Sequence, residues 1–168
     1  MHSNDELMDL VDQQDAVIQV QWRSKIHEHP ELNARAVLIF VMNAEGKLCY
    51  FRRAAHKEYL PNHWALVGGG VQSGESYEQA AIREIAEEVN VVVASLAMRC
   101  LGHVTPTEYP GKFFKMVYEI KVDVHEVPYN QNDFSALQWM TAQELELLAE
   151  TGDLLAHDLL YLVRRFYS

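Results

Sequence analysis

The residues of this chain best suited to chemistry are the carboxylates in the run Arg83-Glu84-Ile85-Ala86-Glu87-Glu88. If the run is helical, its three glutamates lie three and four positions apart, so they share one face. They repel one another there, and no Lys or Arg four residues later relieves the repulsion. Mg²⁺ prefers oxygen ligands, so the spacing favours a divalent-cation site. An isolated acidic run is, however, more often an ordinary solvated helix face.

The elements that would position these glutamates are predicted on either side of them. A short apolar strand over residues 64–67 leads into a glycine loop at 68–70. Ser76 with Gln79 predicts a capping box at the start of a helix, and Asn90 predicts a left-handed stop at its end. Apolar residues at helical spacing predict a buried helix face pointing away from the glutamates: Ile82, Ile85, Ala86 and Val89.

Arg83 lies four residues before Glu87, and we expect the two side chains to form an ion pair. Glu84 and Glu88 would then be freer to bind a metal ion or to transfer a proton. The three glycines ahead of the helix would let backbone amides and carbonyls approach a ligand more closely than a residue with a Cβ allows.

Residues 69–91 resemble the signature of the Nudix hydrolases. In that signature the fixed residues are Gly, Glu, Arg-Glu, an aliphatic residue, Glu-Glu, Gly and a final aliphatic residue. Asn90 stands where the family has its last Gly, and Asn is the next-best residue in a left-handed conformation. The other eight fixed positions match at the family's spacing: Gly69, Glu75, Arg83, Glu84, Ile85, Glu87, Glu88 and Val91.

The resemblance implies a set of metal ligands and the cofactor they bind. The ligands would be Glu84, Glu87 and Glu88, together with the backbone carbonyl of Gly69 or of Gly70. Arg83 and Glu75 would orient these acids through hydrogen bonds. The cofactor would be Mg²⁺, with Mn²⁺ as a substitute. The reaction implied is attack of water on one phosphorus of a diphosphate.

A carboxylate must take the proton of that water, and the resemblance leaves its identity open. In some family members it is the Glu after the signature Arg, here Glu84, and Glu88 is a further candidate. In others it is an acid on a later loop, six residues before a Trp. Asp133 has that position, although a turn residue or cap is an equally good interpretation. Arg52, Arg53 and Gly70 are weaker candidates for binding substrate phosphate.

Further elements follow from pattern, and together with the resemblance they predict an α/β fold. We expect a hairpin over 7–20, a turn of helix capped by Ser24, a second hairpin over 35–52, and strands over 95–104, 113–124 and 136–140. Thr141 with Glu144 would cap a helix over 145–149, and 154–167 would form the last helix. The prediction is one domain, 1–168, with an N-terminal extension at 1–30. Its fold would be a Nudix-type α/β/α sandwich around a central mixed sheet.

Composition limits the partners. The chain has 24 Asp and Glu against 14 Lys and Arg, so its net charge is −10 and nucleic acid is disfavoured. An anionic small molecule remains compatible if divalent cations lie between it and the protein. Cys49 and Cys100 are expected to be buried free thiols. The chain has no signal-peptide pattern and no membrane-spanning run, so we expect a soluble, cytoplasmic protein.

The leading hypothesis is therefore a hydrolase acting on a nucleoside diphosphate linked to another group, with nucleoside di- and triphosphates as the first candidate substrates. A nucleotide-sensing module of the same fold that lacks catalysis is the alternative, and a scaffolding domain is disfavoured by the acids. The N-terminal part also resembles isopentenyl-diphosphate isomerase, but Gly68 and Gly70 replace the isomerase Cys and His. Pro106 and Tyr109 give contradictory hints about substrate, and a homodimer is open by analogy with the fold.

Overall fold

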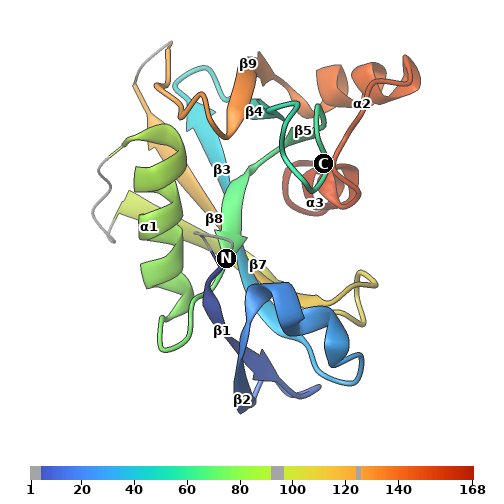
Figure 1. Ribbon diagram of the computed structural model, residues 1–168. Helices are drawn as coiled ribbons and strands as arrows, with labels where there is room; N and C mark the ends of the chain where they lie inside the picture. The colour runs from blue at the N-terminus through green and yellow to red at the C-terminus, as the bar shows by residue number, and fades with distance from the viewer. Residues whose placement is uncertain (1–4, 92–96, 124–125) are drawn as a thin grey trace.

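The computed structural model describes residues 5–91, 97–123 and 126–168. Its central feature is a mixed sheet that lies between helix α1 on one side and helices α2 and α3 on the other, as Figure 1 shows. The expected α/β architecture with a central mixed sheet is confirmed. The strands of this sheet are β3 (Ala34–Asn43), β4 (Leu48–Arg53), β5 (Trp64–Ala65), β6 (Val67–Gly70), β7 (Met98–Val104), β8 (Phe113–Val122) and β9 (Phe134–Met140).

Strand β3 is the centre of the sheet, and its two edges are used differently. Along one edge it pairs in parallel with β8 over its whole length, and β8 pairs antiparallel with β7. The other edge is shared between two antiparallel strands: β6 pairs with residues 36–39, and β4 pairs with Val41 and Met42. β4 in turn pairs with β5 and β9. The sheet therefore forks beside β3, with β6 on one arm and β4 and β9 on the other.

Alternation along β3 builds two cores, because successive side chains of a strand point to opposite faces. One face packs against α1 (Tyr77–Val89) and contains Val37, Ile39 and Val41 with Ala80, Ala81, Ile85 and Val89. The other face packs against α2 (Ala142–Glu150) and α3 (Leu159–Tyr167) and contains Phe40, Leu48 and Tyr50 with Leu145, Leu159, Leu162 and Val163.

The N-terminal hairpin is confirmed as a separate two-stranded sheet of β1 (Leu7–Val11) and β2 (Val17–Trp22). The side chain of Asp12 shapes its turn by accepting the N–H of Gln14 and Ala16 at 2.8 and 3.0 Å. The prediction that Ser24 caps the following helix is wrong. The 3₁₀ helix η1 (Arg23–Glu28) has Trp22 at its N-cap, and the Ser24 hydroxyl instead donates to Asp5 at 2.6 Å.

Two predicted boundaries are also wrong for tertiary reasons. The glycines at 68–70 are not a loop but the end of strand β6, paired with β3. The last helix begins at Leu159 rather than residue 154, because Trp64 exchanges backbone hydrogen bonds with Leu154 and Ala156 and so holds that segment extended. The capping box of Thr141 with Glu144 is confirmed, with α2 starting earlier than predicted. Part of the strand predicted over 95–104 and the end of that over 113–124 lie outside the described residues.

The cysteine prediction is confirmed for Cys49, which is buried, and wrong for Cys100, which is exposed although it lies in a strand. β7 lies at the end of the strand order, so one of its edges carries no neighbouring strand among the described residues. Residues on such an edge strand are less fully covered.

Candidate active site

Helix α1 carries the acidic run and begins and ends as predicted. The Ser76 side chain accepts the N–H of Gln79 at 3.1 Å, the Gln79 side chain accepts the N–H of Ser76 at 2.9 Å, and Asn90 ends the helix with φ 49°. The prediction that all three glutamates point away from a buried face of Ile82, Ile85, Ala86 and Val89 is wrong. Glu84 and Glu88 are only 7% and 9% exposed, whereas Glu87 and the apolar Ala86 are exposed. The helix therefore turns two carboxylates toward the sheet.

The glycines of β6 make room for these carboxylates. A Cβ built on Gly69 would lie 2.3 Å from Oε1 of Glu84 and 2.8 Å from its Oε2. The Glu84 carboxylate thus occupies the space that a side chain at position 69 would take. Burial raises the pKa of Glu84, and the Arg83 guanidinium partly opposes that rise.

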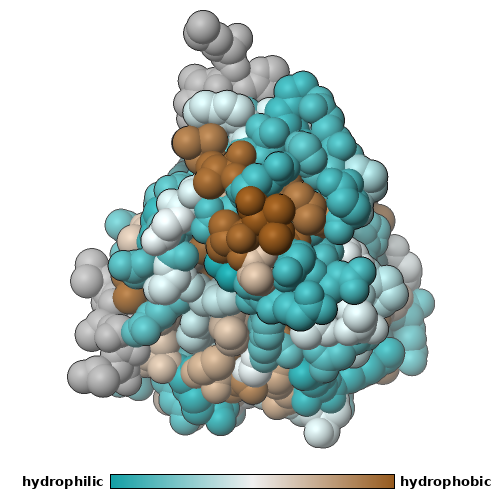
Figure 2. Space-filling model, turned by 90° about the horizontal axis from the view of Figure 1, so that it is seen from below, coloured by the Kyte–Doolittle hydropathy of each residue, from teal (hydrophilic) through white to brown (hydrophobic). Residues whose placement is uncertain are grey.

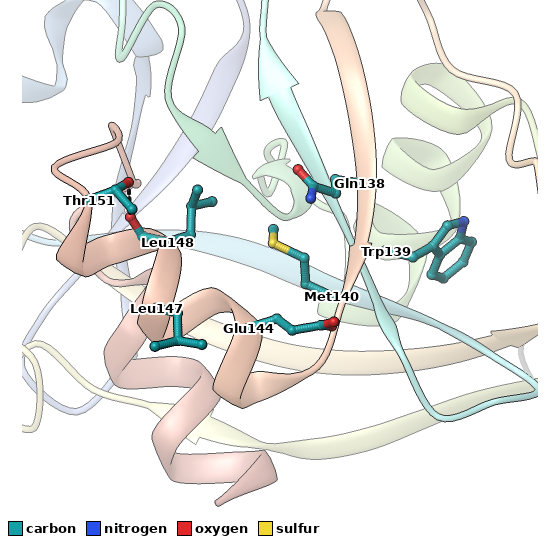
Figure 3. A pocket seen from close by; sticks show the side chains of 7 residues that line it. All are labelled: Gln138, Trp139, Met140, Glu144, Leu147, Leu148 and Thr151. Atoms are coloured by element: carbon teal, nitrogen blue, oxygen red, sulfur yellow. Dashed lines mark hydrogen bonds between the residues drawn. The ribbon is translucent and has the colours of Figure 1, made fainter.

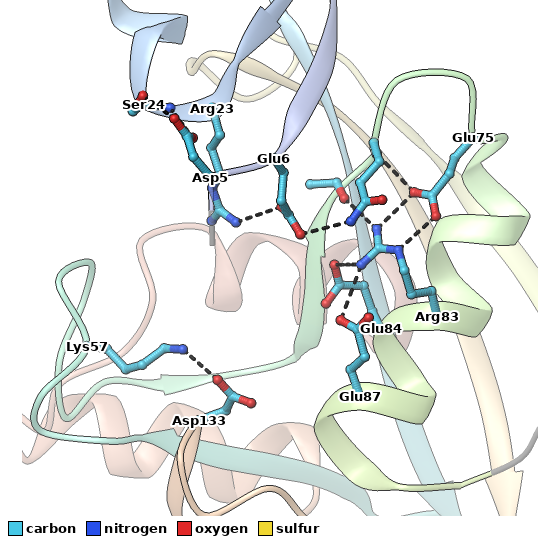
Figure 4. Close-up of polar contacts among 12 residues, drawn as sticks. Asp5, Glu6, Arg23, Ser24, Lys57, Glu75, Arg83, Glu84, Glu87 and Asp133 are labelled. Carbon is cyan, nitrogen blue, oxygen red and sulfur yellow. Dashed lines mark hydrogen bonds and ion pairs between the residues drawn. The ribbon is translucent and has the colours of Figure 1, made fainter. Parts of the chain in front are cut away.

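Arg83 is the hub of the acidic cluster, which Figure 4 shows. Its guanidinium donates two hydrogen bonds to the Glu75 carboxylate at 2.8 and 2.9 Å and one to the carbonyl of Gly70 at 3.0 Å. It also donates to Glu84 at 2.7 Å, and only at 3.4 Å to Glu87. The expected Arg83–Glu87 pair is therefore the weakest contact of this arginine. The expectation that Arg83 leaves Glu84 unpaired is wrong.

Glu88 lies at the fork of the sheet, one helical turn from Glu84. Its Oε2 accepts the backbone N–H of Gly68 at 2.9 Å. Burial and the nearby Glu84 charge raise the pKa of Glu88 to about 8, and the hydrogen bond from Gly68 opposes that rise. The charges of Asp133 and Arg53 also act on this carboxyl, so residues from both arms of the fork surround it.

Asp133 is brought to the same place by the turn that precedes β9. The N–H of Asn130 donates to the Glu88 carbonyl at 2.7 Å, so this turn is anchored on the end of α1. The Asx turn belongs to Asn130, whose side chain accepts the N–H of Asn132. The Asp133 carboxylate instead accepts from Lys57 Nζ at 2.6 Å, a pair that sequence reasoning missed (Figure 4). Nothing in the spacing of Lys57 reveals this contact, because it joins residues 76 positions apart.

The two candidate arginines of β4 point to opposite faces of the sheet. Arg53 is on the Glu88 side and donates to the Tyr59 carbonyl at 3.0 Å. Arg52 lies over the Trp64 ring, 5.8 Å from its centroid, and within 4.0 Å of Asp153. The structure therefore brings Arg53 to the carboxylates and leaves Arg52 on the α3 side, as strand alternation requires.

The N-terminal hairpin borders the acidic cluster, a contribution that sequence reasoning also missed. The Glu6 carboxylate accepts a hydrogen bond from the Gln72 amide at 3.0 Å. Its negative charge also raises the pKa of Glu84, and this contribution is smaller than those of burial and of Glu87. Asp9 accepts from the Ser73 hydroxyl at 2.6 Å. A cleft of about 450 Å³ opens beside these contacts, lined by Asp5, Glu6, Leu7, Trp22, Gln72 and Ser73.

The donor atoms gathered here are oxygens, which suits a hard divalent cation. Among residues 5–91, 97–123 and 126–168, no three Asp, Glu, His or Cys side chains are grouped closely enough to bind a metal ion. Arg83 holds Glu84 and Glu87, and the Gly68 amide holds Glu88, so these side chains would have to leave their present partners to share an ion. The Gly70 carbonyl already accepts from Arg83 at 3.0 Å.

A second pocket, of about 290 Å³, lies between β9 and α2 (Figure 3). Its single charged residue, Glu144, is held by the helix cap at Thr141 and by Lys47. The pocket therefore lacks the convergent charged groups that phosphate chemistry needs. Its lining is Gln138, Trp139, Met140, Glu144, Leu147, Leu148 and Thr151.

Comparison with known proteins agrees with this geometry. Residues 32–161 match the profile of the NUDIX domain. The chain belongs to the Nudix family. An uncharacterized Nudix hydrolase of Nostoc sp. is 40% identical over 164 residues, which is 97% of this chain and 96% of the relative. A Nudix hydrolase of Deinococcus radiodurans is 37% identical over 168 residues, covering 98% and 95% of the two chains.

Solved structures show the same fold. A crystal structure of a Deinococcus radiodurans protein superposes with a TM-score of 0.88 at 36% identity, covering 97% of this Nudix hydrolase and 100% of that chain. The NUDIX domain of Shewanella oneidensis NrtR, solved with ADP ribose, has a TM-score of 0.57 at 21% identity over 77% of this chain and 83% of its own, a likeness of fold alone. Family membership makes this protein a pyrophosphohydrolase, and dependence on divalent metal ions is general in the family. No helix in the described part of the chain is long and apolar enough to cross a membrane.

Proposed function

We propose that this Nudix hydrolase cleaves the diphosphate linkage of a nucleoside diphosphate joined to another group, with nucleoside di- and triphosphates as the first candidate substrates. The observation that carries the proposal is the pair of buried carboxylates, Glu84 and Glu88, packed against the glycine strand β6. Two buried acids one turn apart are unfavourable unless a cation or a proton compensates them. A substrate that is itself anionic therefore requires a divalent cation between it and the protein.

Mg²⁺ would be held by Glu84, Glu87 and Glu88 with the carbonyl of Gly69, and Mn²⁺ is an alternative. The bound ion would polarise phosphate oxygens and offset their charge. These residues suit Mg²⁺ because their donor atoms are all oxygens and because the Glu84 carboxylate fills the space that a side chain at Gly69 would take. Through its bonds to Glu75, Glu84 and Glu87, Arg83 would keep these acids oriented.

The arm of the fork formed by β4 and β9 would bind the substrate phosphates and activate the attacking water. Lys57 contacts Asp133 and the charge of Arg53 acts on Glu88, so these two cations would engage an anion bound beside the carboxylates. Asp133 is held by Lys57 rather than by a helix residue. When a substrate phosphate binds the Lys57 ammonium, the Asp133 carboxylate loses this hydrogen-bond donor and becomes able to accept the proton of water. Asp133, Glu84 and Glu88 are the three candidates for that role.

The test is release of phosphate or nucleotide from a panel of nucleoside di- and triphosphates, ADP-ribose and dinucleoside polyphosphates in the presence of Mg²⁺. We expect one substrate class to turn over, and Glu84→Gln and Glu88→Gln to lower kcat by at least a hundredfold, the scale on which misplaced catalytic groups act. Glu78→Gln, on the exposed face of the same helix, is the matched control and should keep parental activity.

Asp133→Asn separates the roles of the three acids. If Asp133 accepts the proton, this variant loses kcat while Mg²⁺ still binds with parental affinity, whereas Glu84→Gln and Glu88→Gln weaken Mg²⁺ binding as measured by titration calorimetry. Binding of nucleotides without cleavage of any of them would overturn the proposed substrate class. Unchanged activity of both Gln variants would overturn the assignment of the site.

A further inference from the structure

The N-terminal hairpin precedes the part of the chain that the family profile matches, which begins at residue 32. Strand β1 faces the domain, where Met8 and Leu10 are buried beside Ile26 and Ala34. Strand β2 faces solvent, and Figure 2, seen from the side on which the hairpin lies, shows hydrophobic surface gathered within a hydrophilic surround. The large apolar side chains that β2 leaves exposed are Val17, Ile18, Val20 and Trp22. The face that the hairpin turns toward the domain is therefore that of β1.

The loop that joins β6 to α1 runs beside β1, and we call its residues 71–76 the signature loop. The N–H of Ser73 donates to the Leu7 carbonyl at 2.7 Å. The Gln72 side chain donates to the Glu6 carboxylate at 3.0 Å (Figure 4). Backbone and side-chain groups of the hairpin thus both hold this loop in place.

Asp9 is the polar residue of β1 that faces the signature loop. It is only 9% exposed, and its Oδ1 accepts a hydrogen bond from the Ser73 hydroxyl at 2.6 Å. Its Oδ2 accepts the backbone N–H of Gly74 at 3.4 Å. Gly74 has φ +85°, in a region that glycine populates about as readily as others, so its own preference does not fix the loop. Because a buried carboxylate is costly unless donors satisfy it, Asp9 and the loop stabilise one another.

The signature loop extends this constraint to the acids of α1. The N–H of Gln72 donates to the Glu75 carboxylate at 2.9 Å, and the Gln72 carbonyl accepts the N–H of Glu75 at 3.0 Å. Glu75 in turn accepts two hydrogen bonds from Arg83, which donates to Glu84 at 2.7 Å. Hydrogen bonds and the short loop backbone therefore connect Asp9 to the buried Glu84 carboxylate.

A second contact fixes the hairpin turn beside the start of α1. Asp15 accepts from Nε of Arg35 in β3 at 2.6 Å and from the Tyr77 hydroxyl at 3.0 Å. The side chains of Asp15 and Arg35 are each 19% exposed, so this ion pair is largely shielded from water. Because Tyr77 is the first residue of α1, the hairpin contacts both the signature loop and the helix that follows it.

We propose that Asp9 is a positioning residue for the hydrolysis, because it holds the signature loop in the conformation that lets Glu75 and Arg83 orient Glu84. This role depends on the proposed function, in which Glu84 binds the metal ion. Groups that orient metal ligands contribute about ten- to a hundredfold to metal affinity or activity. The N-terminal hairpin is thereby part of the active site of this chain, although it lies outside the family profile.

The first test measures Mg²⁺ affinity by titration calorimetry and kcat on the substrate that the panel identifies. Asp9→Ala should weaken Mg²⁺ binding and lower kcat, each about tenfold or more, while KM changes less than kcat. Asp9→Asn keeps an oxygen acceptor for the Ser73 hydroxyl and should recover most of both quantities. Gln13→Ala, exposed at the turn of the same hairpin, is the matched control and should behave as the parent. If circular dichroism shows that Asp9→Ala is unfolded, Ser73→Ala removes the same contact from the loop side and should reproduce the losses.

Two further measurements trace the route from Asp9 to Glu84. In the double variant Asp9→Ala with Glu75→Gln, the loss of Mg²⁺ affinity should not exceed that of Glu75→Gln alone, because both changes break one line of contacts. In the metal-free protein, NMR should show the Arg83 Nε–H exchanging with solvent about tenfold faster in Asp9→Ala than in the parent.

Parental Mg²⁺ affinity and parental Arg83 exchange in Asp9→Ala and Ser73→Ala would overturn the proposal. Losses that multiply in the double variant would overturn the route through Glu75. The Arg83 exchange measurement needs neither metal nor substrate, so its failure is distinguishable from failure of the proposed function, which Glu84→Gln tests.

Discussion

Substitution of Gly69 by Ala is the most informative single perturbation of the site. The added methyl group would lie 2.3 Å from Oε1 and 2.6 Å from Cδ of Glu84, and no other contact is nearer. The backbone φ of Gly69 lies outside the left-handed region, so the alanine itself is not strained. All of the conflict therefore falls on the Glu84 carboxylate, which must retreat by about 1 Å to reach ordinary van der Waals contact.

The size of the effect follows from what that movement breaks. Glu84 and Arg83 are joined at 2.7 Å, with side chains only 10% and 18% exposed, so the pair cannot shift without loosening a largely buried contact. Overpacking of this kind costs about 1–3 kcal/mol of unfolding free energy. Misplacing a catalytic group by about 1 Å costs on the order of a hundredfold in rate. Gly69→Ala should therefore be folded but nearly inactive.

The assay pairs kcat for diphosphate hydrolysis with urea unfolding monitored by fluorescence. Gly111→Ala is the matched control, because its Cβ would meet no atom nearer than 3.9 Å and its φ is also outside the left-handed region. That variant should keep parental activity and stability within about 0.5 kcal/mol. A Gly69→Ala enzyme with parental kcat would refute the reasoning, since the position of the Glu84 carboxylate would then not matter.

Three further predictions concern stability and substrate binding. Gly68→Ala should lower the free energy of unfolding, measured in urea, more than Gly70→Ala does. A Cβ at position 68, where φ is +155°, would lie 2.2 Å from the backbone carbonyl oxygen of Val37 in β3, whereas a Cβ at position 70 would meet only the Met8 side chain, which can move. The reverse order of stabilities would contradict this prediction. Lys57→Met should raise KM for the substrate about tenfold or more if its ammonium binds phosphate, and an unchanged KM would exclude that role. Glu119→Gln should destabilise the protein at pH 7 by about 1–3 kcal/mol, because the carboxylate accepts hydrogen bonds from Arg99 and Tyr167.

The Glu119 prediction has a definite dependence on pH. Burial alone would raise the pKa of Glu119, but the hydrogen bonds from Arg99 and Tyr167 outweigh burial and lower it. A carboxyl with a lowered folded pKa contributes stability above its unfolded pKa and loses it as the pH falls through the folded value. The stability difference between the parent and Glu119→Gln should therefore shrink below about pH 4.5. A difference that stays constant down to pH 3 would contradict the assigned partners.

The sequence by itself determined the local features of this protein. The capping box at Ser76, the left-handed stop at Asn90 and the spacing of the three glutamates depend on residues within one helix, where neighbours in sequence are neighbours in space. The hairpin turn at Asp12 is local in the same sense. The match to the Nudix signature rests on such short-range spacing, and the family comparison confirmed it.

Only the tertiary structure decided which charged groups meet. Helical periodicity placed Glu84 and Glu88 on a polar face, but glycines without side chains in β6 let both carboxylates face the sheet. The Lys57–Asp133 pair joins residues 76 positions apart, and no local pattern encodes so distant a contact. Arg53 meets the site because β4 forms one arm of the fork beside β3. Burial and long-range pairing depend on how the elements pack, and this packing determines the chemistry of the acids.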